Sequence, residues 1–234
     1  MSVGVRLDQV KCYFSELLFP SCCVGCGKDG AFLCMSCRRS LPQLMPPLCI
    51  KCGNSLSWDG CCTSCLRWEL RIDGIRSPFR YEGIVREAIL QLKYHHLRAI
   101  ARELAQPLAE YLMRMSLPGD VIFPVPLHPR RLRARGYNQS ALLAKELGKM
   151  VGLPIEEGIL WRCIDTPPQA RSDGETRRNN VIGAFRCNEK EVESRSVIVL
   201  DDVCTTGATL SACAETLQVA GVASVWGVAL AREV

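Results

Sequence analysis

Long apolar runs are missing from this chain of 234 residues. No stretch approaches the roughly 18 apolar residues that a membrane-spanning helix needs, which argues against membrane insertion. The first 20 residues place apolar side chains at helical spacing and interrupt them with acidic ones, so they predict a short amphipathic helix and not a signal peptide. We favour packing of this helix on its own domain over a role at a membrane surface. The expected location is the cytoplasm.

Aromatic residues and histidines are also scarce. Aromatic side chains make up 6% of the chain, which does not provide an extended platform for stacking bases. The three histidines are His95, His96 and His128, and we expect them to be exposed or close to phosphate rather than zinc ligands. The net charge of +5 permits a nucleic-acid or phosphate partner but does not require one.

Cysteine, in contrast, is abundant. The chain has 15 cysteines, most of them between Cys12 and Cys65, and no export signal accompanies them. In a reducing compartment, clustered cysteines indicate metal ligands rather than disulfides. Four C-x-x-C pairs carry the pattern: Cys23/Cys26, Cys34/Cys37, Cys49/Cys52 and Cys62/Cys65.

Two C-x-x-C turns together supply the four thiolates that structural zinc prefers, so four pairs predict two closed zinc sites. We pair neighbours into a first cysteine group (Cys23, Cys26, Cys34, Cys37) and a second cysteine group (Cys49, Cys52, Cys62, Cys65). An interleaved pairing, first pair with third, stays open. Because Cys22 and Cys61 each adjoin a ligand, a shift of the register by one also stays open. Redox catalysis is a weaker alternative, since the βαβ context of such motifs is absent.

The cysteine-rich composition ends at Cys65, which predicts two domains, one over residues 1–66 that holds both zinc sites and a second over 67–234. The second domain alternates helical and strand-like patterns. We expect helices at 83–115 (two, or one kinked at Pro107), 138–152 and 209–221, and strands at 120–126, 196–200 and 222–231. This alternation predicts an α/β fold with an open parallel sheet and helices on both faces.

Two adjacent aspartates, Asp201 and Asp202, follow the apolar strand in "VIVLDDVCTTGATL". Open α/β sheets bind ligands at the carboxyl ends of their strands, and carboxylates suit sugar hydroxyls or magnesium reached through water. The turn that follows offers backbone N–H groups, hydroxyls and a helix N-terminus to an anion. Its residues are Thr205, Thr206, Gly207, Ala208 and Thr209, which we call the Thr/Gly turn. A ribose that carries a 5′-phosphate fits both halves.

This pattern resembles the phosphoribosyl pyrophosphate (PRPP) signature of type I phosphoribosyltransferases. With the C-x-x-C pairs, "LKY" (92–94), "PVPLHPRRLRARGYNQS" (124–140) and "QARSDGETRRNNVIGAF" (169–185), nearly the whole chain resembles the ComF/GntX group of competence-associated proteins. The resemblance implies a type I phosphoribosyltransferase-like parallel sheet with a small N-terminal double zinc ribbon. It also implies two structural zinc ions, and magnesium together with PRPP.

Two basic segments are candidates for phosphate binding. "LHPRRLRARGYNQS" carries four arginines with no acid nearby in the sequence, which by itself is equally typical of a solvated basic loop. The resemblance implies that this loop faces pyrophosphate through Arg130, Arg131 and Arg135. The long polar segment at 166–185 predicts a mobile lid, and the resemblance implies that Arg177 and Arg178 close on PRPP. For Lys93, we favour a solvated helix face over a phosphate contact.

Two functions follow from these expectations. The favoured one, implied by the resemblance, is a role in natural transformation and DNA uptake, with PRPP as a ligand. Single-stranded DNA in the cytoplasm and other competence or DNA-processing proteins are the expected partners. The alternative is a magnesium-dependent phosphoribosyltransferase that acts on an unidentified nitrogen acceptor. Asp201 and Asp202 would then be catalytic, because they would offset the positive charge at the reacting carbon.

Overall fold

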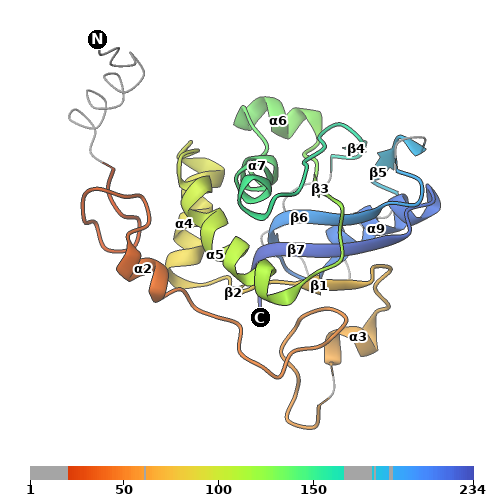
Figure 1. The fold of residues 1–234 in the computed structure, drawn as a ribbon, viewed down its shortest axis with the longest axis horizontal. Coiled ribbons are helices and arrows are strands. Elements are labelled where there is room, and N and C mark those ends of the chain that lie inside the picture. The colour runs from red at the N-terminus through yellow and green to blue at the C-terminus, as the bar shows by residue number, and fades with distance from the viewer. Residues whose placement is uncertain (1–20, 61, 166–180, 182, 190–191) are drawn as a thin grey trace, which may run out of the picture.

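The computed structural model describes residues 21–60, 62–165, 181, 183–189 and 192–234 (Figure 1). The amphipathic helix predicted in the first 20 residues therefore lies outside the described residues. In the part that is described, none of the helices combines the length and the hydropathy that a membrane crossing requires.

The centre of the molecule is a parallel sheet. Its strands are β1 (Gly74–Arg76), β7 (Ser224–Arg232), β6 (Ser196–Cys204) and β3 (Val121–Pro124), in this order, with β2 (Phe79–Arg80) pairing β7 beyond β1. Every one of these pairings is parallel. β6 and β7 lie in the middle and are almost entirely buried, as expected for apolar strands covered on both faces.

Helices cover both faces of this sheet, which confirms the predicted α/β class. One face carries α4 (Gly83–Tyr94), α5 (Ile100–Met115) and α7 (Gln139–Val151), and the other carries α9 (Ala208–Val219) (Figure 1). Each face has its own apolar core; Leu92, Leu104 and Leu143 belong to one, and Leu210 and Leu217 to the other. The 83–115 region forms two helices, and Pro107 lies inside α5.

Several elements differ from the expectations. β6 does not stop at Leu200, because the backbone of Asp201 pairs with Ala229 and the ladder continues to Cys204. The basic segment expected as a loop contains a short helix, α6 (Pro129–Arg135). A proline is favourable in the first helical turn, where its missing N–H is not needed, and Gly136 ends the helix in the left-handed conformation.

A small antiparallel pair was not predicted. It joins β4 (Leu160–Arg162) to β5 (Phe185–Cys187), and most of the chain between them lies outside the described residues. Three residues per strand are too few to leave a clear alternation in the sequence.

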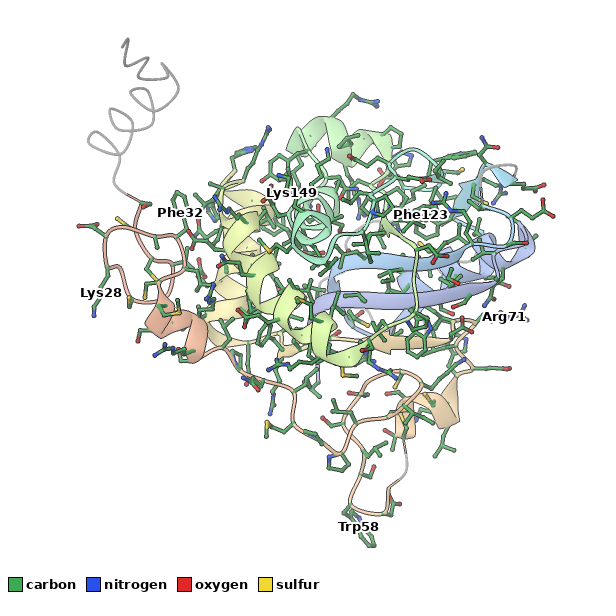
Figure 2. All side chains as sticks on the ribbon, in the orientation of Figure 1. Lys28, Phe32, Trp58, Arg71, Phe123 and Lys149 are labelled. Atoms are coloured by element: carbon green, nitrogen blue, oxygen red, sulfur yellow. The ribbon has the colours of Figure 1, made fainter. Side chains whose placement is uncertain are left out.

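The two cysteine-bearing segments pack in different places (Figure 1). The first contains α2 (Met35–Arg39) and lies beside α5, where the backbone N–H groups of Phe32 and Leu33 donate to the carboxylate of Glu103. The second contains α3 (Thr63–Arg67) and lies against β1, where Ile75 N donates to the carbonyl oxygen of Lys51 at 2.8 Å. At the tip of the second segment, Trp58 points away from the sheet and is 99% exposed (Figure 2).

Candidate functional site

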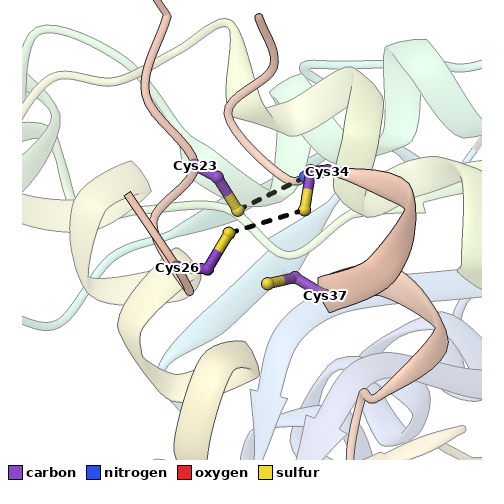
Figure 3. A group of neighbouring side chains, drawn as sticks. All are labelled: Cys23, Cys26, Cys34 and Cys37. Carbon is purple, nitrogen blue, oxygen red and sulfur yellow. Dashed lines mark hydrogen bonds between the residues drawn. The ribbon is translucent and has the colours of Figure 1, made fainter. Parts of the chain in front are cut away.

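The first cysteine group comes together as four converging thiols (Figure 3). All four sulfur atoms lie within 4.8 Å of one another, and the Sγ atoms of Cys26 and Cys34 are 3.7 Å apart. Four sulfurs at about 2.3 Å around a tetrahedral zinc ion would be about 3.8 Å from one another. Cys22 is exposed and its thiol donates to Asp29 at 3.2 Å, so it lies outside the group.

The second cysteine group has the same geometry in a more buried setting. The Sγ distances are 3.8 Å for Cys49 and Cys65 and 3.4 Å for Cys52 and Cys62, and Cys52 is fully buried. Neighbouring pairs thus share each group, and the interleaved pairing is not seen among the described residues. Cys61 lies outside the described residues. The two donor sets fit two structural zinc ions.

The surroundings of the first cysteine group change the pKa values of its thiols in different directions. Burial acts to raise the pKa of the Cys23 thiol, but hydrogen bonds from the backbone N–H groups of Cys34, Gly25 and Cys26 outweigh burial. The net result is a pKa lowered to about 6. Cys34 N lies 3.4 Å from Cys23 Sγ. Burial raises the pKa of Cys37 to about 12. Since zinc binds thiolates, loading the group must release protons, and the affinity for zinc must rise with pH.

The two aspartates on β6 have different surroundings. Asp202 is buried and its Oδ2 lies 2.5 Å from Nζ of Lys93, while Gln139 Nε2 lies 3.5 Å from its Oδ1. Burial raises the pKa of Asp202, but the Lys93 ammonium outweighs it and holds that pKa below its usual range. Asp202 is therefore ionised at neutral pH.

Among the described residues, no cation lies within ion-pair distance of Asp201, although the positive charge of Lys93 acts on it from further away. Its Oδ1 accepts hydrogen bonds from Ser140 Oγ and from the backbone N–H of Asp202, both at 2.9 Å. Burial, followed by repulsion from the carboxylate of Asp202, raises the pKa of Asp201 to about 7. At neutral pH Asp202 is thus ionised and Asp201 is partly protonated, and a bound cation or sugar hydroxyl can shift the protonation of Asp201.

The Thr/Gly turn follows directly at the end of β6. Gly207 has φ +82° and a Cβ there would come within 2.8 Å of Ile75 Cδ1, so both conformation and space require glycine. Thr206 Oγ1 accepts from Ala208 N at 3.3 Å, and Thr205 and Thr209 are half-buried. The first turn of α9, with its free N–H ends, therefore starts at the carboxyl edge of the sheet.

A cavity of about 800 Å³, which we call the arginine cavity, lies next to the aspartate pair. Its lining includes Arg130, Arg131, Arg135, Lys93, Gln139, Tyr94 and Asp165. It meets the aspartates through Lys93 and Gln139, each of which contacts Asp202. The Thr/Gly turn is not part of its lining, and Arg177 and Arg178 lie outside the described residues.

The basic segment at 124–140 has no acidic residue near it in the sequence, but Asp165 lies close to it in the structure. Asp165 lies 3.2 Å from Arg131 and 3.7 Å from Arg130. Arg135 stacks over the ring of Tyr94 at 5.3 Å and donates to Gln139. Arg131 and Arg135 are thus held by neighbouring side chains, whereas the side chain of Arg130 is 76% exposed.

Three contributors to the site were missed in the sequence. Lys93 follows the buried Leu92 on α4, and a lysine at the end of an apolar stripe looks the same whether it faces solvent or a buried acid. Ser140 lies in the first turn of a helix whose N-cap is Asn138, a position that gives no sign of a contact with an aspartate 61 positions away. Asp165 had no signal, because its arginine partners are more than 30 positions away.

Comparisons with known proteins agree with these features. Residues 14–66 match the family described as "Double zinc ribbon domain". Competence protein F of Haemophilus influenzae is 32% identical over 215 residues, which cover 87% of this chain and 92% of that protein. DNA utilization protein YhgH of Salmonella typhimurium is 30% identical, covering 82% and 87%, and competence protein ComFC of Bacillus subtilis is 27% identical, covering 84% and 82%.

Solved structures that resemble the chain include phosphoribosyltransferases. One is a purine phosphoribosyltransferase from Pyrococcus horikoshii, 18% identical with a TM-score of 0.36, which covers 56% of this chain and 73% of that one.

Proposed function

Because this chain belongs to the ComF/GntX family of competence and DNA utilization proteins, we propose that it takes part in DNA uptake as a cytoplasmic, PRPP-binding factor that handles single-stranded DNA. The observation that carries the PRPP part is the aspartate pair. One ionised and one partly protonated carboxyl lie between the arginine cavity and the Thr/Gly turn.

The three parts of PRPP have matching chemistry in this arrangement. The ribose hydroxyls would donate to Asp201 and Asp202, and the 5′-phosphate would accept N–H bonds from the Thr/Gly turn. The pyrophosphate would lie in the arginine cavity, where Arg130 and Arg131 offer planar forks to phosphate oxygens. Magnesium, when bound, would offset the charge of the pyrophosphate.

Calorimetry with PRPP and magnesium tests this function. Wild-type protein is expected to give a saturable heat of binding, which Asp201→Ala with Asp202→Ala removes. Arg131→Ala is expected to weaken binding at least tenfold. The matched control is Arg133→Ala on the same helix, because Arg133 is exposed and outside the cavity lining. No heat with the wild-type protein sinks the proposal.

For the single-stranded DNA, the structure offers one stacking position beside the cavity. Tyr94 is 60% exposed and carries Arg135 over its ring, and Arg98 stacks over Tyr137 at 4.4 Å. A base can stack on such an aromatic–arginine pair while phosphates meet the arginines of α6. Fluorescence anisotropy with a labelled single strand is expected to show affinity that falls steeply with salt and further with Tyr94→Ala. Salt-independent binding, or none, contradicts this role.

Catalysis is the second candidate, favoured by the contrast between the two carboxyl groups. An ionised Asp202 next to the ribose would offset positive charge that develops at its reacting carbon as pyrophosphate leaves. Release of pyrophosphate from PRPP with a nitrogen acceptor, abolished by Asp202→Asn, is the expected result. If PRPP binds but is not consumed with any member of a broad panel of bases and amines, catalysis is refuted and only the DNA-uptake role remains.

A further inference from the structure

Two cavities lie between the carboxyl-terminal half of α5, the strands β1 and β2, and the two cysteine-bearing segments. The larger has a volume of about 530 Å³ and the smaller of about 180 Å³. Tyr111 of α5 lines both, and the consecutive residues 76–79 continue from the smaller cavity into the larger. We call the two together the Met/Arg groove. No described residue lines both this groove and the arginine cavity, so the two are separate features of the surface.

The charged side chains of the Met/Arg groove have mostly one sign. Among the described residues that line it, the cations are four arginines and the only acid is Glu110. Glu110 lies 4.0 Å from Arg38, and Arg76 donates to two backbone carbonyl oxygens, so these two arginines have partners within the protein. Arg39 and Arg114 are exposed, and neither makes an ion pair in the part of the chain that the structure describes. The groove therefore offers two free guanidinium groups to an anionic partner.

Exposed methionines gather at the same groove. Met35 lines the larger cavity and Met115 the smaller, while Met45 and Met113 are next in sequence to residues of the lining. These four, of six in the whole chain, are between 41% and 68% exposed. The unbranched thioether side chain adapts to partners of different shape, and methionine, arginine and tyrosine are enriched in protein–protein interfaces. This composition is typical of a surface that binds another protein.

A buried hydroxyl in the smaller cavity has no partner. Ser77, between β1 and β2, is 3% exposed, and its Oγ makes no hydrogen bond within the described residues. A buried polar group without a partner costs about 1–3 kcal/mol, which a ligand that reaches it with a carbonyl or carboxylate oxygen would remove. Burial also raises the pKa of Tyr111, so its hydroxyl stays protonated at neutral pH and can donate as well.

We propose that the Met/Arg groove docks an acidic segment of a protein partner, with its carboxylates on Arg39 and Arg114 and an apolar side chain against the methionines and Tyr111. Charge complementarity favours such a segment over basic or neutral ones. The first 20 residues of this chain carry two basic and two acidic side chains, and a second copy of the chain has a net charge of +5, so neither matches the groove. This docking depends on neither PRPP nor DNA.

A single strand of nucleic acid is also negatively charged, but the groove suits it less well. Non-specific strand binding combines cations with aromatic rings on which successive bases stack. Of the two rings among the described lining residues, Phe79 is buried, which leaves Tyr111 alone. The exposed apolar groups around Tyr111 are thioethers and not rings.

The first experiment selects peptides from a phage-displayed library of random short sequences on the full-length, zinc-loaded protein. The expected result is enrichment of peptides that combine several acidic residues with an aromatic or aliphatic one. The same selection on Arg39→Ala with Arg114→Ala is expected to lose this enrichment, and the variant should fold because both side chains are exposed. If the wild-type protein enriches no peptide, or only basic or uncharged ones, the proposal is overturned.

The second experiment measures the affinity of the most enriched peptide by fluorescence anisotropy. Arg39→Ala with Arg114→Ala is expected to weaken binding about tenfold, and added salt should weaken the wild-type complex as well. The matched control is Arg102→Ala, an exposed arginine near the other end of α5 that does not line the groove, and its affinity should stay at the wild-type value. An equal loss in the control, or no loss in the double variant, refutes the docking site.

Ser77→Ala separates binding from folding. Its peptide affinity is expected to fall severalfold, while its free energy of unfolding should not decrease, because the hydroxyl has no hydrogen bond to lose in the free protein. A decrease in stability with unchanged peptide affinity would assign the hydroxyl to the fold and remove it from the docking site.

Competition distinguishes the other occupants. An unlabelled oligothymidine, or a synthetic peptide of residues 1–20, is added to the complex with the selected peptide, and neither is expected to displace it. If oligothymidine displaces the peptide and itself binds less tightly to Arg39→Ala with Arg114→Ala, the groove belongs to single-stranded DNA. If the 1–20 peptide displaces it, the groove belongs to the chain's own N-terminal segment. Either result overturns the proposal.

Discussion

The two cysteine groups have the same ligands and spacing, yet they belong to different parts of the molecule. Cys23 and Cys37 are part of the core on the face covered by α4, α5 and α7, whereas Cys49 and Cys52 are part of the core on the α9 face. The first group attaches a segment to the outside of a helix. The second lies against β1, whose residue Ile75 also contacts the Thr/Gly turn at Gly207. Equal chemistry therefore does not imply equal structural importance, because the surroundings decide what each metal site stabilises.

The sharpest test of this contrast replaces one ligand in each group. Cys52→Ser is expected to cost about 5 kcal/mol of unfolding free energy, because it removes a zinc site inside the core. Cys26→Ser is expected to cost about half as much, because Cys26 is exposed. Thermal unfolding with zinc content measured in parallel gives both values. Equal losses would show that the two sites contribute alike.

Lys93 tests how α4, on the face that carries the first cysteine group, is connected to Asp202 at the end of β6. It lies on α4 and pairs with Asp202, so Lys93→Met leaves a buried carboxylate without its cation and is expected to cost roughly 3 kcal/mol. Adding Asp202→Asn is expected to recover much of this loss in denaturant unfolding. If the double variant is as unstable as the sum of the single ones, the ion pair is not the cause.

Gly207 tests the contact of the Thr/Gly turn with β1. Gly207→Ala places a methyl group against Ile75 at a positive φ, and we expect a loss of about 2 kcal/mol in unfolding free energy. Ribose 5-phosphate affinity should fall as well. Combining it with Ile75→Val makes room for the methyl group, so part of the loss should return. No recovery would mean that backbone conformation alone accounts for the effect.

The smallest expected effect is a pH dependence of the free energy of unfolding, which comes from Asp201 and not from the thiols of either cysteine group. The folded state raises the pKa of Asp201 to about 7, so it holds the proton more tightly than the unfolded chain. This stabilisation is complete below the ordinary aspartate pKa near 4 and is lost as pH rises through about 7. We expect the free energy of unfolding to decrease by at least about 1 kcal/mol between pH 4 and 7.

Asp201→Asn should flatten this part of the stability curve measured by denaturant unfolding. The same slope in wild type and in the variant would assign the effect to other groups.

The sequence was most informative where chemistry is local. A C-x-x-C turn places two sulfurs together through its own backbone, so both cysteine groups could be predicted without knowing the fold. The parallel sheet followed from the alternation of apolar runs with helical patterns. The position of Asp201 and Asp202 at the carboxyl edge followed from the sheet.

What could not be predicted depends on distant partners. Lys93 and Asp202 are ordinary charged residues until the sheet brings α4 against β6. β6 was expected to end before its aspartates, because polar residues are unusual in a buried strand unless another element neutralises them. Asp165 carries no pattern of its own, since its role comes from arginines contributed by another segment.

The position of β1 next to β7 has a consequence for how the protein is made. Asp73 and Val225 are joined by a hydrogen bond that spans 152 positions. At roughly 5–20 residues per second, a ribosome needs on the order of 10 s to translate that interval. For this time the nascent chain already displays the thiols of Cys49 and Cys52, while β7, which pairs with the neighbouring strand β1, has not been synthesised. Early metal capture would protect these thiols from oxidation, so zinc supply during translation should affect the yield of correctly assembled protein.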